Sequence, residues 1–380
     1  MGPRKAAKDF LSKHTDAEHF ECTLFGSLAA TGKGHMTDVA IQSVFEGRPL
    51  EIFWKPDEVK RLHPNALELK AFDAENNLLA GMVYYSVGGG KVLNEENFFT
   101  RPVEVYPQLF SHMDKILKYC DREGLNLWEI AVKYEGPEIL DYMEEIWSIM
   151  EDSVKRGLLA EGVLPGGLKY PRKACSYFTQ ALDYSGPLGY TAKAMSYALA
   201  VSEENAAGGK IVTAPTCGSC GVLPGVLYYL QDVYKMPRVK VLRALLTAGI
   251  VGNVIKTTGS ISGAEVGCQG EVGSACAMAS AAAAYLLGGS NHQIEYAAEM
   301  GLEHHLGLTC DPMMGLVQVP CIERNGLAAM RALNHATYAL LSDGRHRVSL
   351  DNVITVMMET GEALPYIFKE TSRGGLATVK

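Results

Sequence analysis

Short stretches in which apolar and polar residues alternate recur through the first third of the chain. A period of two places every second side chain on one face, which is the pattern of a half-buried β-strand. Four such stretches are FECTLFGSL (20–28), LEIFWK (50–55), LELKAF (67–72) and GMVYYSV (81–87). The turn-forming groups HPN (63–65), AENN (74–77) and GGG (88–90) separate them. This part of the chain is therefore predicted to contain a sheet.

Two further stretches complete the first predicted domain. Residues 106–124 have helical spacing, and Gly124 is a typical helix end. The stretch LWEIAVKY (127–134) indicates one more strand. We therefore expect residues 1–136 to form an α/β domain of mixed order.

The pattern changes at Pro137. Residues 137–162 have a long helical pattern without alternation, and the Gly- and Pro-rich residues 162–173 indicate a loop. The rest of the chain is rich in Ala, Gly and Met and mostly helical in pattern. Residues 137–380 are predicted to form an all-α domain, so the fold class is two-domain, mixed α/β followed by all-α.

Composition and charge restrict the function classes. The chain has 380 residues, of which 47% are hydrophobic and 21% are charged, as in ordinary globular proteins. Its net charge of −8 offers no basic excess for phosphates, so we expect no nucleic-acid partner. The apolar runs fall short of the roughly 20 residues that a membrane helix needs, so we expect no membrane partner.

Cysteines are the unusual component. The chain has nine, and its opening MGPRKAAKDF lacks the apolar run of a signal peptide, which predicts a reducing, cytoplasmic location. Cys268, Cys310 and Cys321 each have Gly or Pro neighbours. Thiolates are the usual ligands of iron–sulfur clusters, although these spacings match no ferredoxin pattern. Buried free thiols are the alternative interpretation.

Other motifs are compatible with binding or catalysis. The loop TGKGH (31–35) carries Lys33 and His35, and imidazole suits proton transfer near neutrality, although a surface histidine is the simpler interpretation. The turn at 88–90 could present N–H groups to a carboxylate or merely end a strand. TAPTCGSCG (213–221) precedes a predicted helix, whose N-terminus favours anions. Its CxxC lacks the second pair that a zinc site needs.

Longer words in the sequence resemble one known family. AEVGCQGEVG (264–273), EHHLGLTCDP (303–312) and QVPCIERN (318–325) closely resemble the bacterial iron–sulfur-dependent L-serine dehydratases, or L-serine ammonia-lyases, of the single-chain type. GSLAATGKGHMTD (26–38), VTAPT (212–216) and ETSRGGLA (370–377) resemble them too. The resemblance extends over nearly the whole chain, and it implies an N-terminal beta-like domain and a catalytic, all-helical alpha-like domain.

The resemblance also implies a cofactor and a reaction. It implies one [4Fe–4S] cluster, held by Cys268, Cys310 and Cys321, and no pyridoxal phosphate. Three protein ligands for four irons leave one iron open to act as a Lewis acid on the hydroxyl of L-serine. The implied products are pyruvate and ammonia.

Further residues follow from the same resemblance. His35 is the candidate base in a catalytic group with Lys33, and Thr37 and Asp38 are candidates to orient it, which would put the site between the two domains. The candidate substrate-binding residues are Ser86, Gly88, Gly89, Gly90, Thr213, Thr216 and Arg324. Arg324 is a natural carboxylate partner, although a structural ion pair is an equal alternative. We expect a homodimer, because Gly- and Ala-rich helical domains often pair.

Three alternatives stay open. An iron–sulfur cysteine desulfidase has a similar cluster region. A pyridoxal-phosphate deaminase needs a Schiff-base lysine and a phosphate cup, and Lys91 and Lys256 lie in no such pattern. The family's Gly-Pro-Ser-Ser-Ser-His-Thr stretch does not precede the opening MGP here. An amino-acid-sensing homologue without turnover is therefore the third alternative.

Overall fold

Five strands near the N-terminus form one mixed sheet in the order β2-β1-β3-β4-β5. The computed structural model describes residues 2–99 and 105–379. The strands are β1 (His19–Phe25), β2 (Leu50–Lys55), β3 (Ala66–Phe72), β4 (Leu78–Ser86) and β5 (Val92–Asn94). β1 and β2 pair in parallel, and the remaining neighbours pair antiparallel. The four strands expected from alternation are present, although β1 ends at Phe25 because Gly26 leaves the extended region with a φ of +52°.

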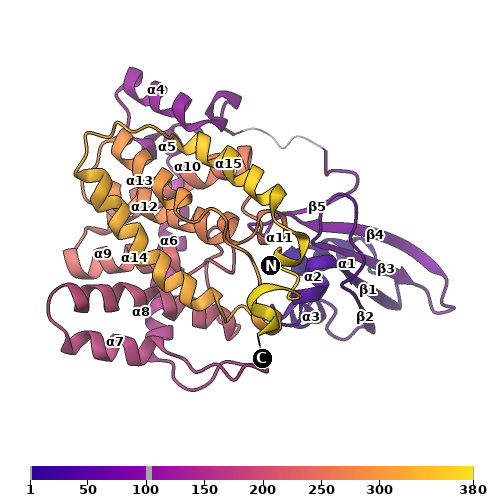
Figure 1. The fold of residues 1–380 in the computed structure, drawn as a ribbon. Helices are drawn as coiled ribbons and strands as arrows, with labels where there is room; N and C mark the ends of the chain where they lie inside the picture. Colours follow the sequence, from indigo (N-terminus) through magenta and orange to yellow (C-terminus); the bar gives the residue numbers. More distant parts are fainter. Residues whose placement is uncertain (1, 100–104, 380) are drawn as a thin grey trace.

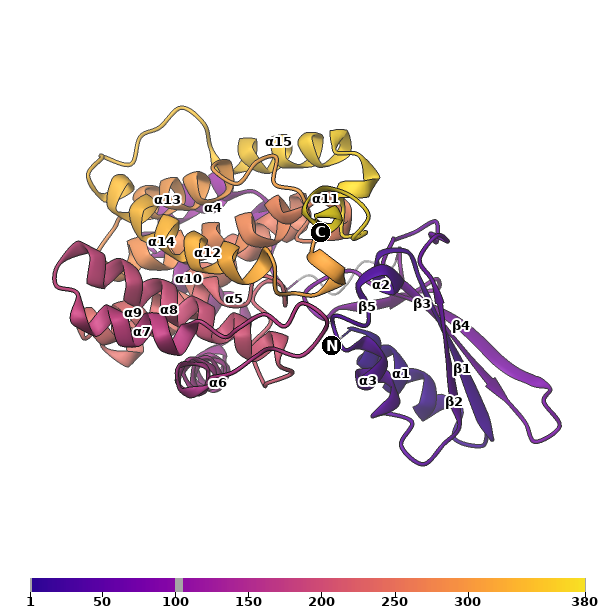
Figure 2. The ribbon, with the colours of Figure 1, turned by 60° about the horizontal axis from the view of Figure 1, so that its bottom comes forward.

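Three helices cover the sheet on the side that faces the rest of the molecule (Figures 1 and 2). They are α1 (Gly2–Lys13), α2 (Gly26–Thr31) and α3 (Thr37–Gln42). Large side chains fill the space between helices and sheet, among them Phe10, Phe20 and Phe45. The rings of Phe20 and Phe45 lie 4.7 Å apart between centroids. The sheet region therefore has a core of its own.

The remaining described residues are mostly helical. The helices are α4 (Met113–Glu123), α5 (Leu127–Glu135), α6 (Ile139–Leu159), α7 (Ala174–Asp183), α8 (Pro187–Ala206), α9 (Val222–Tyr234), α10 (Arg238–Thr258), α11 (Gly263–Val266), α12 (Ser274–Leu286), α13 (Asn291–Glu303), α14 (Cys321–Leu340) and α15 (Leu350–Ala363). Single helical turns lie at 108–111, 269–273, 313–315, 366–368 and 375–378. The predicted fold class, a mixed α/β region followed by a helical region, is confirmed.

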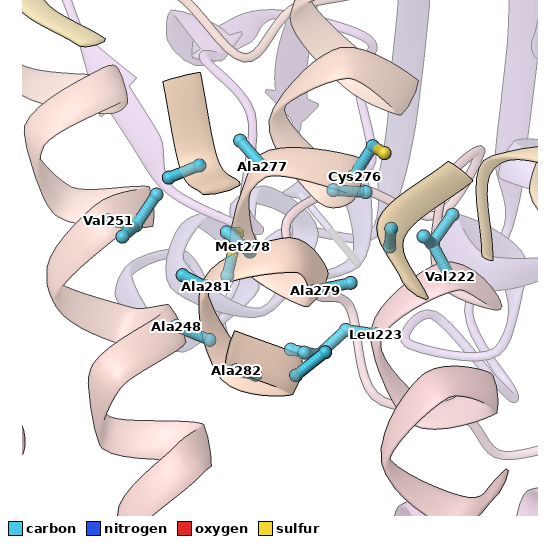
Figure 3. Packing of buried hydrophobic residues seen from close by; sticks show 14 of the residues in the cluster. Val222, Leu223, Ala248, Val251, Cys276, Ala277, Met278, Ala279, Ala281 and Ala282 are labelled. Carbon is cyan, nitrogen blue, oxygen red and sulfur yellow. The ribbon is translucent and has the colours of Figure 1, made fainter. Parts of the chain in front are cut away.

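Helix α12 lies at the centre of the helical region and packs on α9, α10, α13 and α14. Its sequence SACAMASAAAAYL is almost entirely buried, so small side chains set the spacing of its neighbours. Figure 3 shows Ala281 and Ala282 among Ala248 and Val251 of α10 and Leu223 of α9. A Cβ added at Gly301 of α13 would lie only 2.6 Å from the Ala277 Cα. The two helices approach backbone to backbone.

The prediction of a strand at 127–134 is wrong, because these residues form helix α5. Asn126 caps this helix, and its backbone N–H donates to the Glu129 carboxylate at 2.7 Å in a capping box. The helix predicted at 106–124 begins only at Met113, after a separate turn. Its end is as expected, since Gly124 adopts a left-handed φ of 68°.

Helices α4 and α5 lie before the expected domain boundary between residues 136 and 137. Met113 and Ile116 of α4 and Leu127 and Ile130 of α5 are buried in the core of the helical region. We therefore propose that the helical unit begins at α4. Within the described residues, no helix combines the length and the apolar character that crossing a bilayer requires.

Candidate active site between the two regions

A cavity of about 150 Å³ lies where the sheet region meets the helical region. The ends of the described chain also lie at this junction (Figures 1 and 2). Ten of the residues expected at the site line the cavity: His35, Thr37, Ser86, Gly88, Gly89, Gly90, Thr213, Thr216, Cys310 and Cys321. Both regions contribute to this list, so the cavity depends on how they are packed together.

The three expected cysteines come from three separate loops or helix ends. Cys268 follows α11, Cys310 lies in a loop that pairs with Lys369, and Cys321 begins α14. The Cys310 Sγ lies 3.8 Å from the Glu271 carboxylate. Ligand atoms of Cys268, Glu271 and Cys310 all lie within 4.8 Å of one another. This donor set, thiols with one carboxylate, suits a thiophilic metal.

Neighbouring groups lower the pKa of one of the three thiols. A hydrogen bond from the Cys310 thiol and the nearby Arg324 guanidinium lower the pKa of Cys268, against its burial. Burial raises the pKa of Cys321, and the Cys268 sulfur together with burial raises the pKa of Cys310. Two of the three thiols therefore need a bound cation in order to ionise, as is usual for metal ligands.

The backbone leaves space beside these sulfurs. A Cβ added at Gly263 would lie 3.0 Å from the Cys310 Sγ and 2.9 Å from the Glu271 Oε2. A Cβ at Gly218 would lie 3.1 Å from the same carboxylate oxygen. Glycine at both positions keeps the space between thiols and carboxylate open, so these residues fit a metal cluster.

His35 lies on the sheet side of the cavity. Its backbone N–H donates to the Thr31 carbonyl at 3.1 Å, which extends the last turn of α2. About 30% of its side chain is exposed, and desolvation of the part that packs in the protein lowers the pKa of His35 to about 4. The imidazole is therefore neutral at neutral pH and free to accept a proton.

The carboxylate facing His35 was not predicted. The Oε1 of Glu370 lies 4.0 Å from the His35 Nε2. The Glu370 backbone N–H donates to the Cys310 carbonyl at 2.7 Å, and its φ is 57°. Glu370 lines the cavity together with Glu271. The only signal in the sequence was its place in the word ETSRGGLA.

Four expected residues do not line the cavity: Cys268, which lies behind it beside Cys310 and Glu271, and Lys33, Asp38 and Arg324. The Lys33 Nζ lies over the Trp54 ring, 5.4 Å from its centroid. The Asp38 carboxylate accepts a hydrogen bond from the Val39 backbone N–H. Arg324 donates to the Thr309 carbonyl at 2.7 Å and lies 3.6 Å from the Asp311 carboxylate, so it lies behind the cysteine loop.

A buried histidine that sequence reasoning missed connects the two regions. The Nδ1 of His63 accepts a hydrogen bond from the Asn65 backbone N–H, and Asn65 lines the cavity. The Nε2 of His63 lies 3.4 Å from a carboxylate oxygen of Glu265, on α11. This contact links the turn before β3 to the helix that precedes Cys268.

Sequence comparisons place the chain among proteins of one kind. The family model described as "Serine dehydratase alpha chain" matches residues 70–377, and "Serine dehydratase beta chain" matches residues 1–52. An L-serine dehydratase of Streptomyces coelicolor is 41% identical over 431 residues, which cover 99% of this chain and 94% of that protein. L-serine dehydratase TdcG of Escherichia coli is 40% identical, and an L-serine dehydratase of Haemophilus influenzae is 39% identical, with the same coverages.

These matches extend through both the sheet region and the helical region. They include every residue that lines the junction cavity on its helical side. The protein belongs to the serine dehydratase family.

Proposed function

We propose that the protein is an L-serine dehydratase, a lyase that converts L-serine to pyruvate and ammonia in the junction cavity. One observation carries this proposal. The cavity brings Cys310, Cys321 and Glu271 of the helical region opposite His35 and the Gly88–Gly90 turn of the sheet region. Thiol ligands on one side and a neutral base on the other are what removal of a hydroxyl group and an α-proton requires.

The proposed cofactor is a [4Fe–4S] cluster held by Cys268, Cys310 and Cys321. The serine dehydratase family fits an iron–sulfur cofactor, and the cysteines at the cavity are compatible with one. When bound, such a cluster with three protein ligands supplies an open, Lewis-acidic iron for the β-hydroxyl. We propose no role for pyridoxal phosphate.

His35 is the proposed base. Its neutral ring is proposed to accept the α-proton at Nδ1, because its Nε2 faces Glu370. The Glu370 carboxyl is proposed to hold the ring, and Thr37, which also lines the cavity, to support its loop. Loss of the α-proton and breakage of the β-carbon–oxygen bond give 2-aminoacrylate and water. The aminoacrylate tautomerises to an imine, which water hydrolyses to pyruvate and ammonia.

The substrate carboxylate is proposed to bind at the glycine turn. Gly88, Gly89 and Gly90 have φ values of 89°, 57° and 73°, a backbone that side chains strongly disfavour. Such turns direct successive N–H groups toward an anion. Ser86, Thr213 and Thr216 add hydroxyl groups at the same cavity. The cytoplasmic location and the homodimer remain predictions.

The test is purification without oxygen, followed by measurement of iron content and of pyruvate formed from L-serine. We expect about four irons per chain and turnover without added pyridoxal phosphate. Cys268→Ser is expected to lose iron and activity together, whereas Cys175→Ser, which changes a half-buried cysteine on α7 that is not a proposed ligand, keeps both. A metal-free protein that turns over L-serine would refute the cofactor assignment, and an iron-containing protein inert toward L-serine would refute the activity.

The base is tested separately. His35→Ala is expected to retain its iron and to lose about 10²–10⁴-fold in kcat, the usual contribution of a general base. The matched control is His292→Ala, at an exposed position on α13 that pairs with Asp121. Unchanged turnover in the His35 variant would exclude this residue as the base.

A further inference from the structure

A second cavity, of about 410 Å³, lies on the outside of the helical region, between α13, α14 and the loop before α15. It shares no lining residue with the junction cavity. Its volume is in the range of small-molecule sites. The lining residues are Tyr296, Glu299, Met300, Glu303, His304, Asn334, His335, Tyr338, His346, Arg347 and Val348.

The carboxylate of Glu299 lines this cavity without a partner. Glu299 is only 2% exposed, and it makes no hydrogen bond or ion pair with any residue in the described part of the chain. Its neighbours one turn away differ. Glu295 accepts the Leu350 backbone N–H at 2.8 Å and lies 2.9 Å from the His346 Nε2. Glu303 lies 3.4 Å from the His304 Nδ1.

An unpartnered buried carboxyl is costly and calls for an explanation. Burial, together with the like charges of Glu303 and Glu295, raises the pKa of Glu299 to about 8, against the nearby His346. A ligand cation in the cavity would relieve this cost, because it would supply the positively charged partner that the Glu299 carboxylate lacks.

A guanidinium at the same cavity is also unpaired. Arg347 is exposed and, among residues 2–99 and 105–379, has no hydrogen bond or ion pair. The neighbouring Arg345, in contrast, is held by the Asp343 carboxylate. Guanidinium groups bind carboxylates through two parallel hydrogen bonds. The cavity therefore carries one unpaired carboxyl group at a buried position and one unpaired guanidinium group at an exposed position.

Tyrosine and histidine rings form much of the rest of the wall. The rings of Tyr296 and Tyr338 meet edge to face with centroids 6.0 Å apart. The rings of His304 and His335 lie 5.2 Å apart. A shared metal ion is not favoured, because in the part of the chain that the structure describes the one convergent donor group is at the cysteines. The walls suit the apolar body of an organic molecule.

From these groups we propose that the cavity binds an amino acid as a zwitterion, with its ammonium group at Glu299, its carboxylate at Arg347 and its side chain beside the tyrosines. The proposal is independent of the reaction at the junction cavity. It requires that both charges of the ligand contribute to binding.

The experiment is isothermal titration calorimetry on the full-length, anaerobically purified protein. The probes are L-leucine, L-phenylalanine, L-lysine and L-glutamate, none of which has the β-hydroxyl that the junction cavity is proposed to use. The leucine analogues 3-methylbutylamine and 4-methylpentanoate each lack one of the two charges. We expect at least one amino acid to bind with one site per chain, and an analogue with one charge to bind at least tenfold more weakly.

The variants Glu299→Gln and Arg347→Gln are each expected to weaken binding at least tenfold. Their matched controls, Glu359→Gln on the exposed face of α15 and Arg345→Gln, keep the affinity of the parent protein. Glu299→Gln preserves shape and removes an unpartnered acid, so we expect its melting temperature without probe to be equal to or above that of the parent.

Three results would overturn the proposal. The first is no binding of any probe at 10 mM. The second is binding that both cavity variants leave unchanged, which would assign the probe to another site. The third is a lower melting temperature in both single variants and no additional loss in the double variant, which would show that Glu299 and Arg347 pair with each other.

Discussion

The sheet region and the helical region build their cores in opposite ways. The sheet region buries large rings, since Phe10, Phe20 and Phe45 fill the space under its helices. The helical region also buries a large ring at Trp147, but at its centre α12 and α13 meet at Ala277 and Gly301 with almost no side-chain atoms between their backbones. Buried ring volume stabilises the core of the sheet region, whereas small residues allow close backbone packing at the centre of the helical region. A substitution that removes side-chain volume should therefore destabilise the sheet region, and one that adds side-chain volume should destabilise the helical region.

The largest expected effect is in the sheet region. Phe20→Ala removes a fully buried ring and is expected to cost about 3–5 kcal/mol of unfolding free energy, the usual range for such cavities. The measurement is urea denaturation together with amide hydrogen exchange of β1 and β3. Phe53→Ala, on β2 with 41% of the residue exposed, is the control and should cost far less. Equal losses would show that ring volume does not stabilise this core.

A smaller effect is expected in the helical region, from an addition. Gly301→Ala places a methyl group 2.6 Å from the Ala277 Cα and should cost about 1–3 kcal/mol, because neither backbone can yield without moving its helix. Gly249→Ala, on α10, meets no atom within 4 Å and should stabilise by about 0.4–1 kcal/mol. Urea denaturation of both variants measures whether the free energy of unfolding falls or rises in each. A stabilising Gly301 variant would contradict the close approach.

The smallest effect is expected between the regions. Arg373, between the helical turns at 366–368 and 375–378, pairs with the exposed Asp57 of the sheet region. Exposed ion pairs contribute little, because water and salt screen them. Arg373→Gln should leave the denaturation midpoint and the KM for L-serine unchanged. A clear rise in KM would show that this contact, rather than the buried contacts around His63, holds the regions in register.

Much of the fold could be predicted because its signals are local. The strand LEIFWK matches β2 from Leu50 to Lys55, and the helix end at Gly124 follows from its backbone freedom. The error at 127–134 has an identifiable cause. Aromatic and branched residues in LWEIAVKY favour a strand, but the Asn126 and Glu129 capping box and packing on α10 favour a helix. The two capping-box residues are visible in the sequence, and here they outweigh the strand propensity of LWEIAVKY.

The site was predictable only as far as its residues stand in recognisable words. His35, Ser86 and the cysteines lie in such words, and His35, Ser86, Cys310 and Cys321 line the cavity. The partners of these residues are set by tertiary packing. Apart from the word ETSRGGLA, nothing in the sequence distinguishes the half-buried Glu370 from the many exposed carboxylates. Nothing at all distinguishes the buried Glu299, and nothing places Arg324 behind the Cys310 loop. Burial and distance between segments far apart in the chain have no local signature.

The contact between His35 and Glu370 also has a consequence for biosynthesis. These two residues stand near opposite ends of the sequence. At about 5–20 residues per second, a ribosome makes the second roughly 17–67 s after the first. The sheet region can fold during that interval, but the wall that Glu370 completes cannot yet exist. A cofactor held by all three cysteines can be completed only after Cys321 has been made, late in synthesis and shortly before Glu370.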